Sequence, residues 1–201
     1  MTTAETTAES TTWSAALDGL EAVVQARRSN LRVDPEREVP ADLLRRLCAL
    51  ATWAPNHKRT EPWRFVAFTG AGRARLGTAF EASQRADGVT DDAKLAKART
   101  KYGRAPVVLA VVSAGGDSPV RRDENRDAVS AGIQNLLLGA TAAGLATLWS
   151  TGGATVADEV RALCGCAPTD QIVGLVYLGW PLDGDVAVPA RTLATITTID
   201  V

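Results

Sequence analysis

The stretch 105–113, APVVLAVVS, constrains the fold of this chain more than any other. A proline stands at its second position, and the residues that follow are apolar and mostly β-branched until the final serine. A continuous apolar run of this kind is typical of a central strand that is buried on both faces. A second run, 171–178 (QIVGLVYL), predicts another buried strand. We therefore expect a sheet whose central strands have no face in contact with water.

Length and composition favour one domain with a substantial core. The chain has 201 residues, of which 46% are hydrophobic, and no composition break or long Gly/Ser linker divides it. Residues 1–12, rich in Thr, Ala, Glu and Ser, lack an apolar anchor. We therefore expect a disordered leader over 1–12 and a single domain over 13–201.

The charge balance excludes some classes of partner. The chain carries 22 basic and 23 acidic residues, a formal net charge of -1, which argues against general binding of nucleic acid or a membrane surface. No apolar run reaches the length of a membrane span, and the N-terminus lacks the regions of a signal peptide, so we expect a cytoplasmic protein. Three cysteines do not form a disulfide framework and fit a reducing compartment.

Apolar periodicity predicts alternating helices and strands. The expected helices are 14–28, 40–53, 71–85, 91–102, 122–143 and 155–163. The expected strands are 63–69, 105–113, 145–149 and 171–178. In the first helix, Trp13, Leu17, Leu20 and Val24 share one face. A short apolar alternation over 193–199 is a candidate edge strand, on this subunit or on a partner.

The first helix ends in RRSNLR, 27–32, where hydrophobic residues would be expected. One interpretation is that cations complement the dipole at the C-terminus of the helix while Ser29 and the next residue begin a turn. The other is an anion site, because arginine forks pair with phosphate oxygens and a serine hydroxyl adds a donor. From the residues alone both interpretations stay open, and the anion site would involve Arg27, Arg28, Ser29 and Arg32.

The segment 54–65, APNHKRTEPWRF, is predicted to be a stiff loop. Its two prolines restrict their own φ angles and push the preceding residues toward extended geometry. The loop contains the only histidine of the chain, His57, next to Asn56 and two basic residues. A stiff polar loop of this kind is a candidate binding element, and Trp53 stands directly before it.

Three further features of the sequence give weaker indications of a binding site or an interface. The turn WSTGG, 149–153, lets backbone N–H groups face a ligand, although most Gly-rich turns only change the chain direction. Gly132 and Gly139 lie on one side of their helix, which fits either close packing inside the domain or a subunit interface. Cys48, Cys164, Cys166 and His57 form a weak candidate metal site, and free thiols are the favoured interpretation.

Four motifs in sequence resemble the nitroreductase family of FMN-dependent oxidoreductases. They are RRSNLR, APNHKRTEPWRF, AGIQNLLLGATAAGLATLWSTGG and IVGLVYLGWP, and they span nearly the whole chain in the order of the family. The loop is similar to that of the compact branch with an Ala-Pro-Asp/Asn-His-Lys sequence. The resemblance implies an α+β fold with a central mixed β-sheet flanked by helices. It also implies an obligate, intertwined homodimer with two FMN sites at the interface.

The resemblance also implies which residues contact the flavin. Segment 27–32 would hold the phosphate and ribityl chain, and the loop carrying Pro55, Asn56 and His57 would approach from the other subunit. The turn after the strand 145–149 would lie along the isoalloxazine ring or the phosphate. The expected cofactor-binding residues are Arg27, Arg28, Ser29, Arg32, Trp53, Pro55, Asn56, His57, Trp149, Ser150 and Thr151. No metal is expected.

The implied activity is a ping-pong oxidoreduction. NADH or NADPH would pass a hydride to the flavin, and an electron-poor small molecule such as a nitroaromatic or a quinone would then accept the electrons. The protein would contribute positioning and positive charge or N–H donors. No essential acid–base residue is named, and His57 is the candidate for such a role.

Two departures from the family pattern leave alternatives open. Relatives of this branch often carry basic residues where Trp53 and Ser150 stand here, so the chain either holds FMN less by charge or uses Trp53 for ring packing and substrate choice. One alternative activity is another reaction on the same fold, such as flavin reduction, dehalogenation or flavin breakdown. A second alternative is a flavin-binding protein with little turnover that serves as a store, sensor or partner-binding module.

Overall fold

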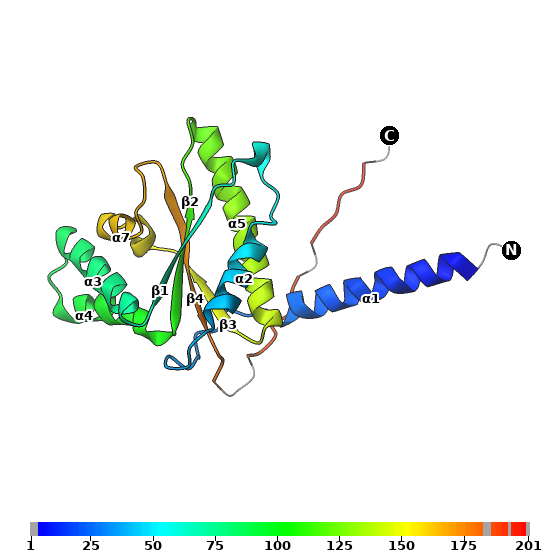
Figure 1. The fold of residues 1–201 in the computed structure, drawn as a ribbon, viewed down its shortest axis with the longest axis horizontal. Coiled ribbons are helices and arrows are strands. Elements are labelled where there is room, and N and C mark those ends of the chain that lie inside the picture. Colours follow the sequence, from blue (N-terminus) through cyan, green and yellow to red (C-terminus); the bar gives the residue numbers. More distant parts are fainter. Residues whose placement is uncertain (1–3, 183–185, 193, 200–201) are drawn as a thin grey trace.

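A four-stranded sheet in the order β1-β2-β4-β3 forms the centre of the molecule (Figure 1). The structure, a computed structural model, describes residues 4–182, 186–192 and 194–199, with side chains from Ser14 onward. The strands are β1 (Trp63–Thr69), β2 (Val107–Ser113), β3 (Ala146–Ser150) and β4 (Gln171–Gly179). Neighbouring strands pair antiparallel, with Trp63 opposite Ser113, Val107 opposite Leu178 and Ala146 opposite Gly179. The buried strands expected from the two apolar runs are thus adjacent.

Helices cover both faces of this sheet (Figure 1). On one face α3 (Ala71–Ala86), α4 (Asp92–Thr100) and α7 (Asp158–Leu163) lie over Val108, Ala110 and Val112. On the other face α2 (Ala41–Ala51) and α5 (Pro119–Ala142) lie over Val107, Leu109 and Val111. Every residue of β2 is buried, because alternate side chains enter two separate apolar layers.

Local chemistry explains where several elements begin. Strand β2 starts at Val107, after Pro106, because proline has no N–H to donate to the ladder. Helix α5 begins at Pro119, earlier than expected, where the Ser118 hydroxyl accepts a hydrogen bond from the Arg121 N–H at 3.2 Å. The helix expected over 155–163 is divided into α6 (Gly153–Val156) and α7, because Ala157 between them has an extended backbone. Short 3₁₀ turns occupy His57–Arg59 and Lys101–Arg104.

The sheet differs in one respect from the expected mixed sheet. All pairings between its strands are antiparallel, and the parallel pairing that the described residues contain is the isolated bridge between Ser29 and Thr147. The candidate edge strand begins at Leu193, which lies outside the described residues, and 194–199 forms no strand here. Pairing of that segment with a partner therefore stays a prediction.

The two glycines of α5 allow close packing inside the chain. A Cβ at Gly132 would lie 2.6 Å from the Ala51 carbonyl oxygen, and one at Gly139 would lie 2.5 Å from Leu50 Cδ1. Helix α2 therefore lies closer to α5 than residues with side chains would permit. Of the two interpretations of the glycine pair, the structure supports packing inside the domain.

Helix α1 (Ala4–Ala26) extends away from the rest of the molecule (Figure 1). It begins within the stretch predicted as a leader, and the division at residue 12 stays a prediction. The described side chains of its predicted apolar face are not covered by the described residues of the chain: Leu20 is 55% exposed, and Leu17 and Val24 are exposed as well. A helix with an uncovered apolar face needs another surface to cover it.

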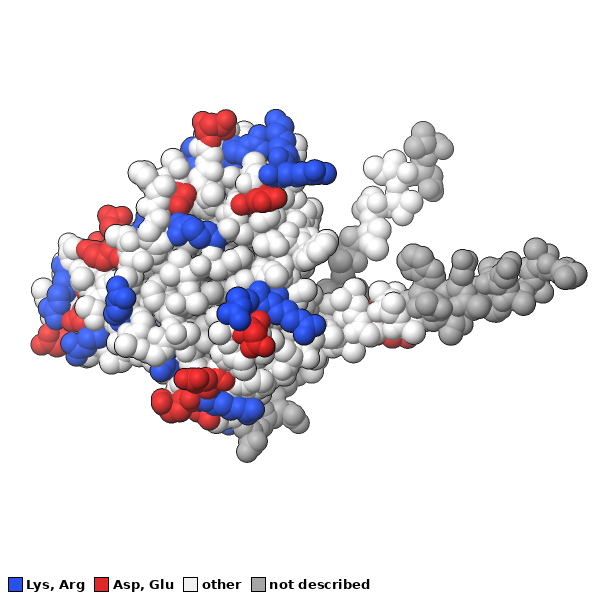
Figure 2. Space-filling view, in the orientation of Figure 1, with Lys and Arg blue, Asp and Glu red and all other residues white. Residues whose placement is uncertain are grey.

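The face of the molecule drawn in Figure 2 shows no broad region of one charge sign. On the face drawn in Figure 2, basic and acidic side chains are interspersed, in agreement with the net charge of -1. Within the described part of the chain, no helix is both long and apolar enough to span a membrane.

Candidate functional site

The segment that follows α1 is pinned against the first residues of β3. Ser29 forms its bridge with Thr147, and the Asn30 N–H donates to the Thr147 carbonyl oxygen at 2.8 Å. The Asn30 side chain in turn accepts from the Arg32 N–H at 2.8 Å, and the Arg32 carbonyl accepts from the Leu182 N–H at 2.9 Å. These bonds give the predicted anion-binding segment a defined backbone before any ligand binds.

Arg28 lies at this segment with part of its guanidinium unsatisfied. Its Nη1 donates to the Arg27 carbonyl oxygen at 2.6 Å, but its Nε is buried and has no hydrogen-bond partner among the described residues. Leaving a buried donor unpaired costs about 1 to 3 kcal/mol. A buried N–H without a partner is expected where an acceptor atom of a ligand forms the missing hydrogen bond.

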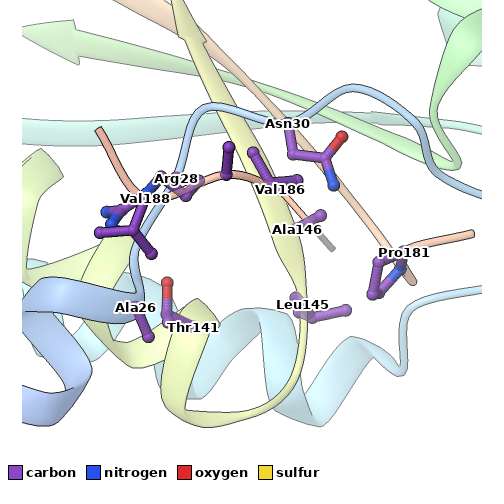
Figure 3. Close-up of a pocket in the computed structure, with 10 residues that line it drawn as sticks. Ala26, Arg28, Asn30, Thr141, Leu145, Ala146, Pro181, Val186 and Val188 are labelled. Carbon is purple, nitrogen blue, oxygen red and sulfur yellow. The ribbon is translucent and has the colours of Figure 1, made fainter. Parts of the chain in front are cut away.

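Arg28 borders a pocket of about 540 Å³ (Figure 3). Asn30 and Thr141 supply its other polar side chains, and the remaining lining is apolar: Ala26, Leu145, Ala146, Pro181, Val186, Ala187 and Val188. A cationic fork at the edge of a mainly apolar hollow fits a ligand with one anionic group and a larger uncharged body.

The three residues of the turn that are predicted to bind the cofactor lie at the C-terminal end of β3 and directly after it. Trp149 is half-buried, its ring lies against Gly174, and its Nε1 donates to the Val173 carbonyl oxygen at 3.4 Å. Ser150 is half-buried and Thr151 is exposed. Since a strand rises about 3.3 Å per residue, Ser150 lies about 10 Å from the Thr147 bridge. One strand thus connects segment 27–32 to the turn.

The loop between α2 and β1 has a strained backbone and packs against the start of α5. Lys58, Arg59 and Glu61 have positive φ angles of 56°, 50° and 47°. Residues with a Cβ rarely adopt this conformation, and it persists where surrounding contacts hold it. The loop is therefore strained, and Glu61, directly before Pro62, has a positive φ angle instead of the extended backbone expected there.

Three predicted site residues of this loop line one shallow hollow. Pro55, Asn56 and His57 border a pocket of about 530 Å³ together with residues of α5: Glu124, Asp127, Ala128 and Ala131. The His57 side chain is 57% exposed, and its Nε2 lies 3.9 Å from Glu124 Oε1. Trp53, directly after α2, is 83% exposed. The loop thus presents polar and aromatic groups outward rather than into its own core.

The two groups of predicted residues do not meet within one chain. Arg28 shares its pocket with Thr141, near the end of α5, whereas His57 shares its hollow with Ala128, near the start. These two positions are thirteen residues apart, which corresponds to about 20 Å along a helix. The two pockets share no lining residue.

Sequence reasoning missed four residues that shape these surfaces. Asn30 stands inside the RRSNLR motif, so its role could have been sought there, and Thr147 lies in a predicted strand. Thr60 and Asn125 are joined by a hydrogen bond across 65 residues of sequence, for which no local pattern exists.

The three cysteines are free thiols, of which Cys164 is buried and Cys48 and Cys166 are partly buried. Burial raises the pKa of Cys48 to about 11 and that of Cys164 to about 11, so both stay protonated at neutral pH. Over the described ranges of the chain, no three or more His, Cys, Asp or Glu side chains are grouped so that they could hold a metal ion.

Known proteins with a similar sequence or fold identify the family of this chain. The nitroreductase family model matches residues 24–180. The Escherichia coli (strain K12) protein named "Putative NAD(P)H nitroreductase YdjA" is 31% identical over 166 residues, 82% of this chain and 89% of that protein. A crystal structure of a nitroreductase-like family protein from Bacillus cereus is 30% identical with a TM-score of 0.76, covering 87% of this chain and 91% of that one.

A second solved structure carries a cofactor. The nitroreductase with bound FMN from Bacteroides fragilis NCTC 9343 is 26% identical with a TM-score of 0.69, and the match covers 90% of this chain and 98% of that chain. The expected nitroreductase-like α+β fold is thereby confirmed. Sequence and fold agree over the same residues, and the chain belongs to the nitroreductase family, a family of enzymes.

Proposed function

We propose that this chain is an FMN-dependent oxidoreductase that uses NADH or NADPH to reduce an electron-poor acceptor, such as a nitroaromatic or a quinone. The observation that carries the proposal is the buried, unpaired Nε of Arg28 on the rigid segment beside β3. A flavin phosphate would supply the missing acceptor, and the apolar pocket lining would suit the rest of the cofactor. FMN binding in a related nitroreductase of the same fold supports this assignment.

The protein's own groups would hold and orient the cofactor. Arg28 and Ser29, with Arg27 and Arg32 beside them, would bind the phosphate through charge-assisted hydrogen bonds. Trp149, Ser150 and Thr151 would line the ring at the other end of β3. When bound, FMN supplies two-electron transfer from NAD(P)H to a second substrate in alternating half-reactions. The chain's part is positioning and electrostatic support rather than a nucleophile.

A homodimer would complete this site. About 20 Å along α5 separates Thr141 of the Arg28 pocket from Ala128 of the His57 hollow, which supports the proposal that Pro55, Asn56 and His57 reach the cofactor of the other subunit. The uncovered apolar face of α1 supports the same arrangement, because a second copy would bury it. We assign His57 and Trp53 to contacts with the cofactor or substrate.

Reconstitution with FMN tests the proposal directly. The purified chain is expected to take up one FMN per subunit, and the flavin absorbance is expected to bleach when NADH or NADPH is added without oxygen. An acceptor added afterwards is expected to restore the absorbance. A chain that stays colourless after reconstitution contradicts the proposal. A yellow protein that neither NADH nor NADPH reduces supports a flavin-binding protein with little turnover instead.

Trp53 is expected to favour planar aromatic acceptors. Its electron-rich ring is exposed beside the loop, and stacking of an electron-poor ring on it is worth about 0.5 to 1.5 kcal/mol. Trp53→Ala is therefore expected to raise KM for a quinone about 2- to 10-fold, while Trp53→Phe stays close to the parent. Ferricyanide, which has no aromatic ring, is the control acceptor. An equal change in KM for both acceptors would contradict this role.

A further inference from the structure

A chain of side-chain hydrogen bonds holds the strained loop. The Asn56 Nδ2 donates to Thr60 Oγ1 at 3.0 Å, and Thr60 Oγ1 donates to Asn125 Oδ1 at 2.7 Å. The Asn56 Oδ1 accepts from the Glu61 N–H at 2.8 Å, which closes the loop on itself. The Thr60 hydroxyl is the centre of this relay because it accepts one hydrogen bond and donates the next.

Asn125 attaches the relay to the interior. Its side chain is on α5, the residue is 3% exposed, and its Nδ2 donates to the carbonyl oxygens of Ala114 and Gly115 at 3.2 and 3.0 Å. Its Oδ1 faces the Thr60 hydroxyl, so both ends of the amide have partners of the correct kind. A buried amide satisfied at both ends has one orientation, and the loop takes its position from it.

The anchor behind Asn125 is itself rigid. The Gly115 N–H donates to Asp170 Oδ1 at 3.0 Å, and Asp170 Oδ2 lies 3.0 Å from Arg64 Nη2. Burial would raise the pKa of Asp170, but hydrogen bonds from the N–H groups of Ala167 and Gly115 and the pairing with Arg64 outweigh it and lower that pKa. The carboxylate therefore stays ionised at neutral pH and holds the end of β2 in place.

The relay ends at a residue that faces the shallow hollow. Asn56 is both its outermost member and, with Pro55 and His57, part of the hollow's lining. Neither Thr60 nor Asn125 borders that hollow, so they act on it through Asn56. The positive φ angles of Lys58, Arg59 and Glu61 need such a restraint, because an unrestrained loop would relax to commoner backbone conformations.

We propose that Thr60 and Asn125 are positioning residues of the cofactor site, which fix the loop so that Asn56 and His57 meet the flavin of the partner subunit. The inference rests on the proposed function, and it adds two residues that contact neither cofactor nor substrate. They restrict the loop to its binding conformation before the cofactor binds. The entropy cost of ordering the loop on binding is therefore smaller.

Three threonine variants test the inference. Thr60→Val keeps the shape of the side chain but removes the hydroxyl, Thr60→Ser keeps the hydroxyl, and Thr52→Val is the matched control. The Thr52 hydroxyl donates only to the Ala49 carbonyl oxygen within the same turn, at 2.9 Å. Thr60 itself is exposed, so its replacement removes no core side chain, although Thr60→Val takes the Thr60 hydroxyl away from Asn125 Oδ1.

FMN affinity and the visible circular dichroism of the bound flavin are the measurements. Thr60→Val is expected to raise Kd for FMN about tenfold and to change the dichroism spectrum. Thr60→Ser and Thr52→Val are expected to match the parent, and Tm is expected to stay within a few degrees throughout.

The possible results separate this inference from the proposed function. A parent protein that binds no FMN overturns both. A parent that binds FMN, with Thr60→Val equal to it in Kd and spectrum, overturns the positioning role alone. The positioning role is also overturned if Thr60→Ser loses affinity as Thr60→Val does and Tm falls in both, because a purely structural defect would then explain the loss.

Discussion

Replacing Arg28 with alanine is expected to weaken FMN binding about 10- to 150-fold. The guanidinium carries a buried Nε without a partner, and a phosphate oxygen would complete it. A charge-assisted hydrogen bond contributes about 1.5 to 3 kcal/mol, and each 1.4 kcal/mol corresponds to a factor of ten. Titration of the apoprotein with FMN, followed by quenching of flavin fluorescence, measures the change in Kd.

The same substitution has a second expected result in the absence of FMN. The apoprotein should lose little stability, because Arg28→Ala removes an unsatisfied donor along with its one hydrogen bond to the Arg27 carbonyl oxygen. Arg37→Ala is the control, since Arg37 stacks on Trp180 at 4.2 Å and lies outside the proposed site. Unchanged FMN affinity in Arg28→Ala, or an equal loss in Arg37→Ala, would refute the assignment of the phosphate site.

Leu20→Asp is expected to dissociate the proposed dimer and, with it, the bound FMN. Leu20 lies on the uncovered apolar face of α1, 55% exposed in the single chain. Burying one leucine is worth about 1.5 to 3 kcal/mol, and a symmetric interface loses that contribution from both copies. The dimer dissociation constant should rise about a hundredfold or more, because a carboxylate in an apolar interface adds a desolvation penalty.

Light scattering and flavin content measure this effect together. Ala22→Asp is the matched control, because position 22 is exposed on the opposite side of the same helix. It should stay dimeric and yellow, whereas Leu20→Asp should be monomeric and colourless. A monomer that still binds FMN would contradict a site shared between subunits, and a dimer in Leu20→Asp would exclude this face of α1 from the interface.

Strands and their burial were predictable because they depend on local composition. The bounds of β1, Trp63–Thr69, agree with the expectation, and the apolar runs correctly indicated two central strands. The single helix expected over 155–163 was wrong, because the structure divides it at Ala157. The periodicity of the sequence contains no signal for this division.

The sequence by itself determined the family, the α+β class and the segments that belong to the candidate site. RRSNLR and APNHKRTEPWRF are short motifs in which residue type and spacing already offer a candidate anion site and predict a stiff loop. Such motifs carry their chemistry locally, so they can be recognised without coordinates.

Only the tertiary structure decided which of these segments lie together. Ser29 meets β3 at Thr147, while Asn56 and His57 line a separate hollow at Ala128, about 20 Å along α5 from Thr141 of the Arg28 pocket. The structure also showed the unpaired Nε of Arg28 and the bond from Thr60 to Asn125. Hydrogen bonds between residues 65 positions apart depend on how the helices pack on the sheet. No single stretch of sequence contains that information.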